Sequence, residues 1–139
     1  MAPIPAGFLG LRHGPAYAAS DALKIIMYGR GAHGSRPEVS VDPVVMAAAT
    51  VMRLQTVVSR EVAATETAVL TIGALRAGTK ENIIPDDAEL LLSIRTFDPS
   101  VLARVMAAIE RIVNAEAAAR GRTQATRDHP HAVVPCRDQ

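Results

Sequence analysis

The dipeptide Asp-Pro occurs twice, and each time it lies between a strand-like segment and an apolar helical stripe. Asp42 and Asp98 can cap a helix, because their side chains accept hydrogen bonds from the first free backbone N–H groups. The proline that follows suits the first helical position, where its fixed φ is already helical and its missing N–H costs nothing. The repeat predicts helices over 43–60 and 99–120, within a mixed α and β fold.

Three segments have the apolar alternation or the β-branched content of strands, namely 22–29, 67–75 and 89–97. The order is strand, helix, strand, strand, helix, with a weak strand pattern near 123–128. Two halves of the βαβ type predict an α+β fold, a ferredoxin-like two-layer sandwich with an antiparallel four-stranded sheet and two helices on one face. The open face of that sheet would carry Lys24, Tyr28, Ser93 and Arg95.

The strand over 67–75 is expected at an edge of the sheet, and it is apolar and uncharged. Such an edge aggregates unless it pairs with a specific partner. The helix over 43–60 has an apolar arc wider than one partner requires, extending through Val44 and Ala48, with Thr50 on its solvated face. These features predict a homodimer joined through strand 67–75 and helix 43–60.

Composition excludes several classes of protein. The 139 residues suit one domain, and the formal net charge of +1 provides no field that would attract nucleic acid or an anionic membrane. An aromatic content of 3% cannot build a base-stacking surface. The single Cys136 excludes an intrachain disulfide, and no continuous apolar run or signal peptide is present, so we expect a cytoplasmic protein.

His33 is the sharpest candidate for chemistry. It lies in the loop 29–37, which contains three glycines and a proline, and we expect these glycines to give the backbone the freedom to present the imidazole. An imidazole placed in this way can donate to a developing oxyanion or transfer a proton. The alternative is a turn histidine that bonds a local carbonyl.

Asn82 and Arg95 are candidates for substrate binding. Asn82 could offer its amide to a carboxylate or carbonyl, or could simply bond its own turn. Arg95 could bind an anion through two hydrogen bonds, or could be a solvated strand residue.

Metal binding within the chain is not expected. Asp86 and Asp87 are adjacent and would point to opposite sides of an extended segment, so turn solvation is the better interpretation. His129 and His131 flank a proline, where chelation is again the weaker interpretation.

Six motifs occur in order and resemble one known family. The chain is similar, from about residue 5 to 121, to the dimerisation (lid) domain of dinuclear metallopeptidases and amidohydrolases, which include aminoacylases, hippurate hydrolases and auxin-conjugate hydrolases. The motifs are Ser20-Asp21-Ala22-Leu23, Gly29-Arg30-Gly31-Ala32-His33-Gly34-Ser35-Arg36-Pro37, Val41-Asp42-Pro43-Val44-Val45, Leu54-Gln55-Thr56-Val57-Val58-Ser59-Arg60-Glu61, Gly78-Thr79 with Asn82-Ile83-Ile84-Pro85-Asp86, and Ser93-Ile94-Arg95-Thr96.

The resemblance implies that residues 21–121 are a lid domain of a larger hydrolase. Residues 1–20 would be a connecting segment from a missing catalytic domain, and 122–139 an atypical tail, either a last strand or disordered. That catalytic domain would hold two divalent ions, zinc or manganese, and would hydrolyse an N-acyl amino acid or small peptide through metal-activated water and a carboxylate base.

The resemblance also assigns roles to three residues. His33 would stabilise the oxyanion in the active site of the partner subunit, Asn82 would bind substrate, and Arg95 would bind its anionic group. The isolated chain, which has none of the family's metal-ligand motifs, would be inactive. The alternative is a stand-alone ferredoxin-like dimer that binds a small effector without catalysis.

Overall fold

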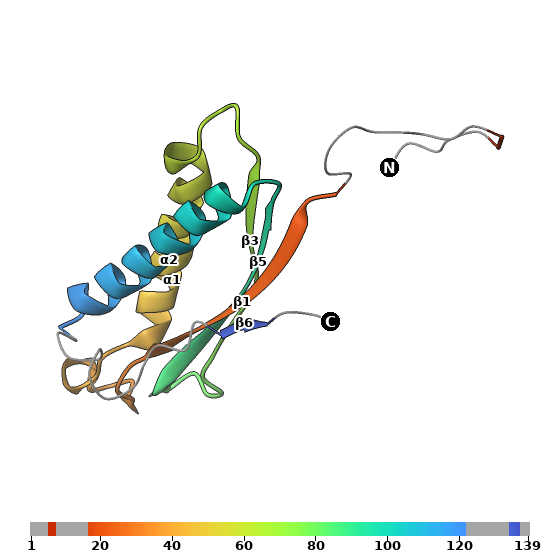
Figure 1. Ribbon diagram of the computed structural model, residues 1–139. Helices are drawn as coiled ribbons and strands as arrows, with labels where there is room; N and C mark the ends of the chain where they lie inside the picture. Colours follow the sequence, from red (N-terminus) through yellow and green to blue (C-terminus); the bar gives the residue numbers. More distant parts are fainter. Residues whose placement is uncertain (1–5, 8–16, 122–133, 137–139) are drawn as a thin grey trace.

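The computed structural model describes residues 6–7, 17–121 and 134–136. The three long strands and the two α-helices follow one another in the predicted order (Figure 1), and the structure adds the short strands β2 and β4, which the sequence pattern did not predict. In chain order the elements are β1 (Ala19–Tyr28), β2 (Ala32–His33), η1 (Pro37–Val39), α1 (Pro43–Thr56), η2 (Val57–Glu61), β3 (Ala68–Ala77), β4 (Ile83–Ile84), β5 (Asp87–Thr96), α2 (Pro99–Ala119) and β6 (Val134–Cys136).

The main sheet has the strand order β3-β5-β1-β6, and all its neighbours are antiparallel. Both helices lie on the same side of this sheet (Figure 1). The α+β class with two helices and antiparallel sheets is therefore confirmed. The predicted strand near 123–128 lies outside the described residues, and the tail contributes β6, which pairs with β1 along Ala22–Lys24.

The two Asp-Pro caps form as predicted. Asp42 Oδ1 accepts hydrogen bonds from the backbone N–H groups of Val44 and Val45, at 2.8 and 3.3 Å. Asp98 Oδ1 accepts one from Ser100 N at 2.7 Å. The first helical segment reaches Glu61, but its last turn, η2, is a π-helix.

The predicted core face of α1 is wrong by part of a turn. Val44 and Ala48, expected in the core, are exposed, whereas Thr50, expected in solvent, is fully buried. The hydroxyl of Thr50 has no hydrogen-bond partner among the described residues. An arc so rich in alanine and valine does not fix the helical phase by hydrophobicity alone, and packing selects the buried set. That set is Pro43, Met46, Ala47, Thr50, Leu54 and Val57.

β3 forms an edge of the sheet, as expected, and it is not a regular strand. Its register against β5 shifts between Ile72 and Ala74, so Gly73 forms a β-bulge. Val69 and Leu75 remain 48% and 43% exposed. The apolar edge is therefore open to solvent in the single chain.

Glu89 forms ion pairs with both neighbouring strands on the open face of the sheet. Glu89 on β5 bonds Lys24 on β1 and, at 3.0 Å, Arg76 on β3. The hydrogen bond from Lys24 is the main reason that the pKa of Glu89 lies below its ordinary value. Within the described residues, neither helix carries an apolar stretch long enough to cross a lipid bilayer.

Replacement of Glu89 should make the chain less stable at neutral pH. Because the folded-state pKa of Glu89 is lowered, its contribution is present above the ordinary value of 4.5 and disappears as the pH falls through the folded pKa. Urea unfolding from neutral to acidic pH should therefore show Glu89→Gln below the wild type at pH 7, with the two curves converging in acid. Glu110→Gln, on the exposed side of α2, is the control. A deficit that persists unchanged in acid would contradict this account.

Candidate functional site

His33 and Asn82 come together at one end of the molecule. β2 and β4 form a two-stranded antiparallel ribbon in which His33 pairs with Ile83. The backbone N–H of Gly34 donates to the carbonyl oxygen of Asn82 at 2.8 Å. Both candidate side chains are exposed. Residues nearly 50 positions apart in the sequence therefore present an imidazole and an amide from one small ribbon.

The glycines around His33 serve close packing and not conformational freedom, contrary to the expectation from sequence. Among the described residues, only Gly7, Gly78 and Gly121 have positive φ. A Cβ on Gly29 would lie 2.2 Å from the carbonyl oxygen of Val41, and one on Gly31 would lie 2.7 Å from that of Ile84. The backbone is therefore closely packed at Gly29 and Gly31, and this packing fixes the position of His33.

Asp86 connects the loop 29–37, which carries His33, to the loop 77–87, which carries Asn82. Its carbonyl oxygen accepts from Gly29 N at 2.6 Å, and its side-chain Oδ1 accepts from Gly31 N at 2.8 Å. Asp86 is thus a structural link between the two Gly/Pro loops, where the sequence predicted only turn solvation. Its neighbour Asp87 begins β5 and pairs with Tyr28.

The imidazole of His33 makes its described side-chain contacts through one nitrogen. Nδ1 lies 2.7 Å from the hydroxyl oxygen of Ser35, and the backbone N–H of Ser35 donates to the same nitrogen at 3.2 Å. A turn closed by donation from Arg36 N to His33 O at 2.8 Å holds this geometry. The described residues supply no hydrogen-bond partner for Nε2. The predicted alternative, a histidine that bonds a local carbonyl through its ring, is not what this geometry shows.

Ile83 adds an apolar neighbour to the site. It lies opposite His33 in the ribbon and is 49% exposed. Residues directly opposite in an antiparallel pair share a face. The exposed surface at His33 therefore combines a polar ring with an aliphatic side chain.

Arg95 lies at the other end of the sheet. It pairs with Ser20 at the start of β1 and with Val69 at the start of β3, whereas His33 follows the end of β1. Its side chain is exposed, as predicted. Within one chain, the structure does not bring Arg95 together with His33 and Asn82.

Metal coordination finds no support in the part of the chain that the structure describes. There, no group of three or more His, Cys, Asp or Glu side chains is placed to hold an ion. His129 and His131 lie outside the described residues.

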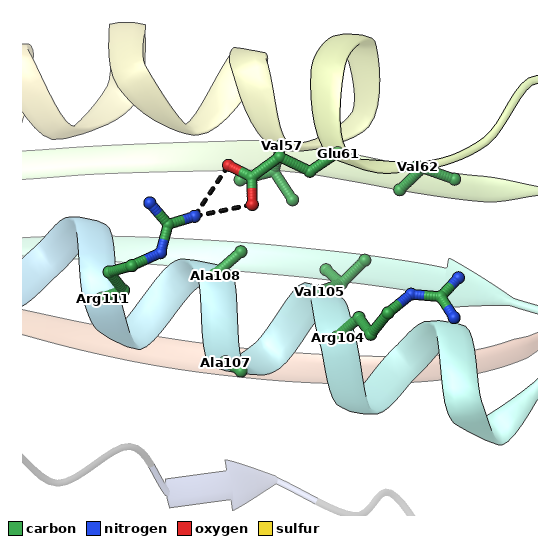
Figure 2. A pocket seen from close by; sticks show the side chains of 8 residues that line it. All are labelled: Val57, Glu61, Val62, Arg104, Val105, Ala107, Ala108 and Arg111. Atoms are coloured by element: carbon green, nitrogen blue, oxygen red, sulfur yellow. Dashed lines mark hydrogen bonds and ion pairs between the residues drawn. The ribbon is translucent and has the colours of Figure 1, made fainter.

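A hollow of about 350 Å³ separates η2 from α2 (Figure 2). Its charged groups already have partners. Arg111 donates to both carboxylate oxygens of Glu61, at 2.8 and 2.6 Å, and Arg104 pairs with Glu66. None of the three predicted site residues lines this hollow. The hollow lies where these two helical segments pack against each other, and it is not part of the site at His33.

Loss of the Asp86 side chain should remove the hydrogen bond from the amide of Gly31 while leaving the one from Gly29 intact. In Asp86→Ala, the amide of Gly31 loses its acceptor, and we expect its hydrogen exchange to be about tenfold faster or more. The amide of Gly29 bonds the backbone oxygen of Asp86 and should remain protected, which makes it an internal control. Asp86→Asn retains Oδ1 and should behave as the wild type. Unchanged exchange at Gly31 in Asp86→Ala, measured by NMR, would contradict the link.

A family profile described as a peptidase dimerisation domain matches residues 19–121. The chain is 36% identical over 118 residues to N-acetylcysteine deacetylase of Bacillus subtilis, covering 85% of the chain and 31% of the relative. It is 36% identical over 119 residues to N-acyl-L-amino acid amidohydrolase of Geobacillus stearothermophilus, covering 86% of the chain and 32% of the relative.

A solved structure agrees with the sequence relatives. It is that of a putative aminohydrolase from methicillin-resistant Staphylococcus aureus, with a TM-score of 0.72 and 31% identity over 75% of this chain and 28% of the other. The chain thus spans less than a third of each of these proteins. The profile covers the strands and helices that carry the ribbon at His33, and it bears out the resemblance that the six motifs suggested. The chain belongs to the peptidase dimerisation domain family.

Proposed function

We propose that the chain is the dimerisation domain of a metal-dependent N-acyl-amino-acid amidohydrolase or peptidase, and that it supplies His33 to the active site of the partner subunit. The observation that carries the proposal is the exposed imidazole of His33, fixed by Ser35 on one nitrogen and free of described hydrogen bonds on the other. A donor held in this way can stabilise the oxyanion that develops when an amide carbonyl is attacked. The names of the relatives, a deacetylase and an amidohydrolase, support this substrate class.

The described residues do not fit a metal centre, so the divalent ions of the parent enzyme would be held outside this segment. The chain by itself would therefore be inactive. Membership of the dimerisation family also disfavours the alternative of a stand-alone effector-binding module.

The homodimer would form through the β3 edge and the outer face of α1. Met52 is 73% exposed on that helix, and Val44 and Val45 are exposed on the same element. Leu75, opposite the buried Leu90, lies on the helix-covered side of β3 and would add to this apolar face, whereas Val69, opposite the exposed Arg95, lies on the other side of the unpaired strand. Apolar side chains beside an unpaired strand are the arrangement expected where two sheets join edge to edge. We include in this proposal a ferredoxin-like sheet of four strands, completed by β6.

Such a dimer would also explain the position of Arg95. If β3 pairs antiparallel with its two-fold copy, the strand directions reverse across the interface. The end of the sheet that carries His33 in one subunit then coincides with the end that carries Arg95 in the other. Asn82 and His33 of one subunit would thus lie at the same end as Arg95 of its partner, which supports roles for all three in binding one anionic substrate.

The catalytic role is testable in a chimera in which residues 19–121 replace the matching segment of the Geobacillus amidohydrolase. With an N-acetyl amino acid as substrate, His33→Ala should lower kcat by about 10²-fold or more, the effect of a lost oxyanion donor. Lys80→Ala, in the neighbouring loop, is the control and should retain kcat.

The isolated chain, assayed with added zinc or manganese, should show no turnover. Metal-dependent activity of the isolated chain would refute the proposal that the metal ions are held outside this segment. An unchanged kcat in His33→Ala would remove His33 from the mechanism.

The interface is testable by sedimentation equilibrium of the chain. We expect a dimer that Met52→Lys combined with Leu75→Lys converts to monomer, because two charges would be buried without partners. Ala103→Lys, on the exposed side of α2, should leave the dimer intact. A wild-type chain that is strictly monomeric at high concentration would contradict the interface.

A further inference from the structure

Ser35 contacts the imidazole of His33 twice, and the two contacts together constrain where the ring carries its proton. The backbone N–H of Ser35 points at Nδ1 at 3.2 Å, and the Ser35 hydroxyl lies 2.7 Å from the same atom. A backbone N–H can only donate a hydrogen bond. The nitrogen that receives it must offer a lone pair, so this contact favours the ring form in which Nδ1 carries no proton.

A neutral imidazole has one N–H and one lone pair. With the lone pair at Nδ1, the proton is at Nε2, and the Ser35 hydroxyl is free to donate to Nδ1 as well. Nε2 is also the nitrogen for which the described residues supply no partner. The contacts of Ser35 therefore select the tautomer whose N–H is available to a ligand.

We propose that Ser35 is a positioning residue that holds His33 in the Nε2–H tautomer, so that this N–H is the outward hydrogen-bond donor of the site. The catalytic meaning of this inference rests on the proposed function, but the tautomer itself does not. An oxyanion donor must present a proton and not a lone pair, because a lone pair would repel the developing charge. Ser35 would thus raise the fraction of neutral His33 that can serve as a donor.

The local chain explains why Ser35 can do this. His33 and Arg36 are the first and last residues of a turn, and the donation from Arg36 N to His33 O closes it. In that turn the N–H of Ser35 faces back toward the side chain of His33. The hydrogen bond from Gly34 N to the carbonyl oxygen of Asn82, the residue that precedes β4, anchors the same turn. Backbone geometry therefore sets one contact, and the side chain of Ser35 adds the other.

The tautomer can be measured in the 139-residue chain with ¹⁵N-labelled histidine, by multiple-bond ¹H–¹⁵N correlation at a pH where the ring is neutral. His33→Gln assigns the signals. The wild type should have Nε2–H as the main form. Ser35→Ala removes the hydroxyl and keeps the backbone N–H, and it should raise the Nδ1–H to Nε2–H ratio by about threefold or more. Ser35→Thr keeps a hydroxyl and should restore the ratio.

Ser40→Ala is the matched control, because the Ser40 hydroxyl bonds the carbonyl of Pro37 in the same loop. It should leave the ratio unchanged. The direction of the Ser35→Ala effect is decisive: if the hydroxyl accepted a proton from Nδ1, its removal would lower the Nδ1–H population. A fall or no change in that ratio, or Nδ1–H as the main wild-type form, would overturn the proposal.

The chimera with the Geobacillus amidohydrolase distinguishes failure of this inference from failure of the proposed function. There, Ser35→Ala should lower kcat about threefold to tenfold at unchanged KM, with recovery in Ser35→Thr. If kcat is unchanged while the tautomer shifts, Ser35 has no catalytic role. If His33→Ala is also without effect, it is the proposed function that fails, and the tautomer result stands by itself.

Discussion

The two hydrogen bonds that Asp86 accepts from Gly29 and Gly31 hold the candidate site in place. They join the loop that follows β1 to the loop that precedes β5, and the ribbon of β2 and β4 forms between them. The site needs this connection because two paired strands of two residues each cannot be stable alone. The position of His33 thus depends on the carboxylate and the backbone carbonyl of Asp86, a residue with no part in the chemistry proposed for the imidazole.

Sequence reasoning was accurate where one signal carried the information. Asp42 and Asp98 mark helix starts through a local capping interaction, and β3 was placed at an edge by the order of elements. It failed where the signal was degenerate or absent. Alanine and valine surround most of α1, so the sequence did not show which face, the one with Thr50 or the one with Val44, would be buried. Strands as short as β2 and β4 have no periodicity to detect. The motif around His33 predicts a functional loop, and its role stays a prediction. The contacts that Ser35 and Asp86 make in this loop could not be predicted from the sequence, because they depend on the backbone geometry of the two loops.

In the proposed dimer, the three candidate residues would form a site divided between subunits. His33 and Asn82 share one ribbon, whereas Arg95 lies at the far end of the sheet. A single chain cannot direct all three at one small ligand, so oligomerisation is part of the proposed chemistry and not an addition to it. This is why exposure of the β3 edge, unfavourable in an isolated domain, agrees with the function proposed for the family member described here.

The bulge at Gly73 has a consequence for how that edge behaves before assembly. The bulge divides the strand into Ala68–Ile72 and Ala74–Ala77, so the outward-facing backbone is no longer one flat ladder. Neither part reaches the length of about six residues that steric zippers use. The exposed edge of β3 thus offers only two short, mismatched templates to the strands of other proteins, which limits nonspecific pairing along this apolar edge.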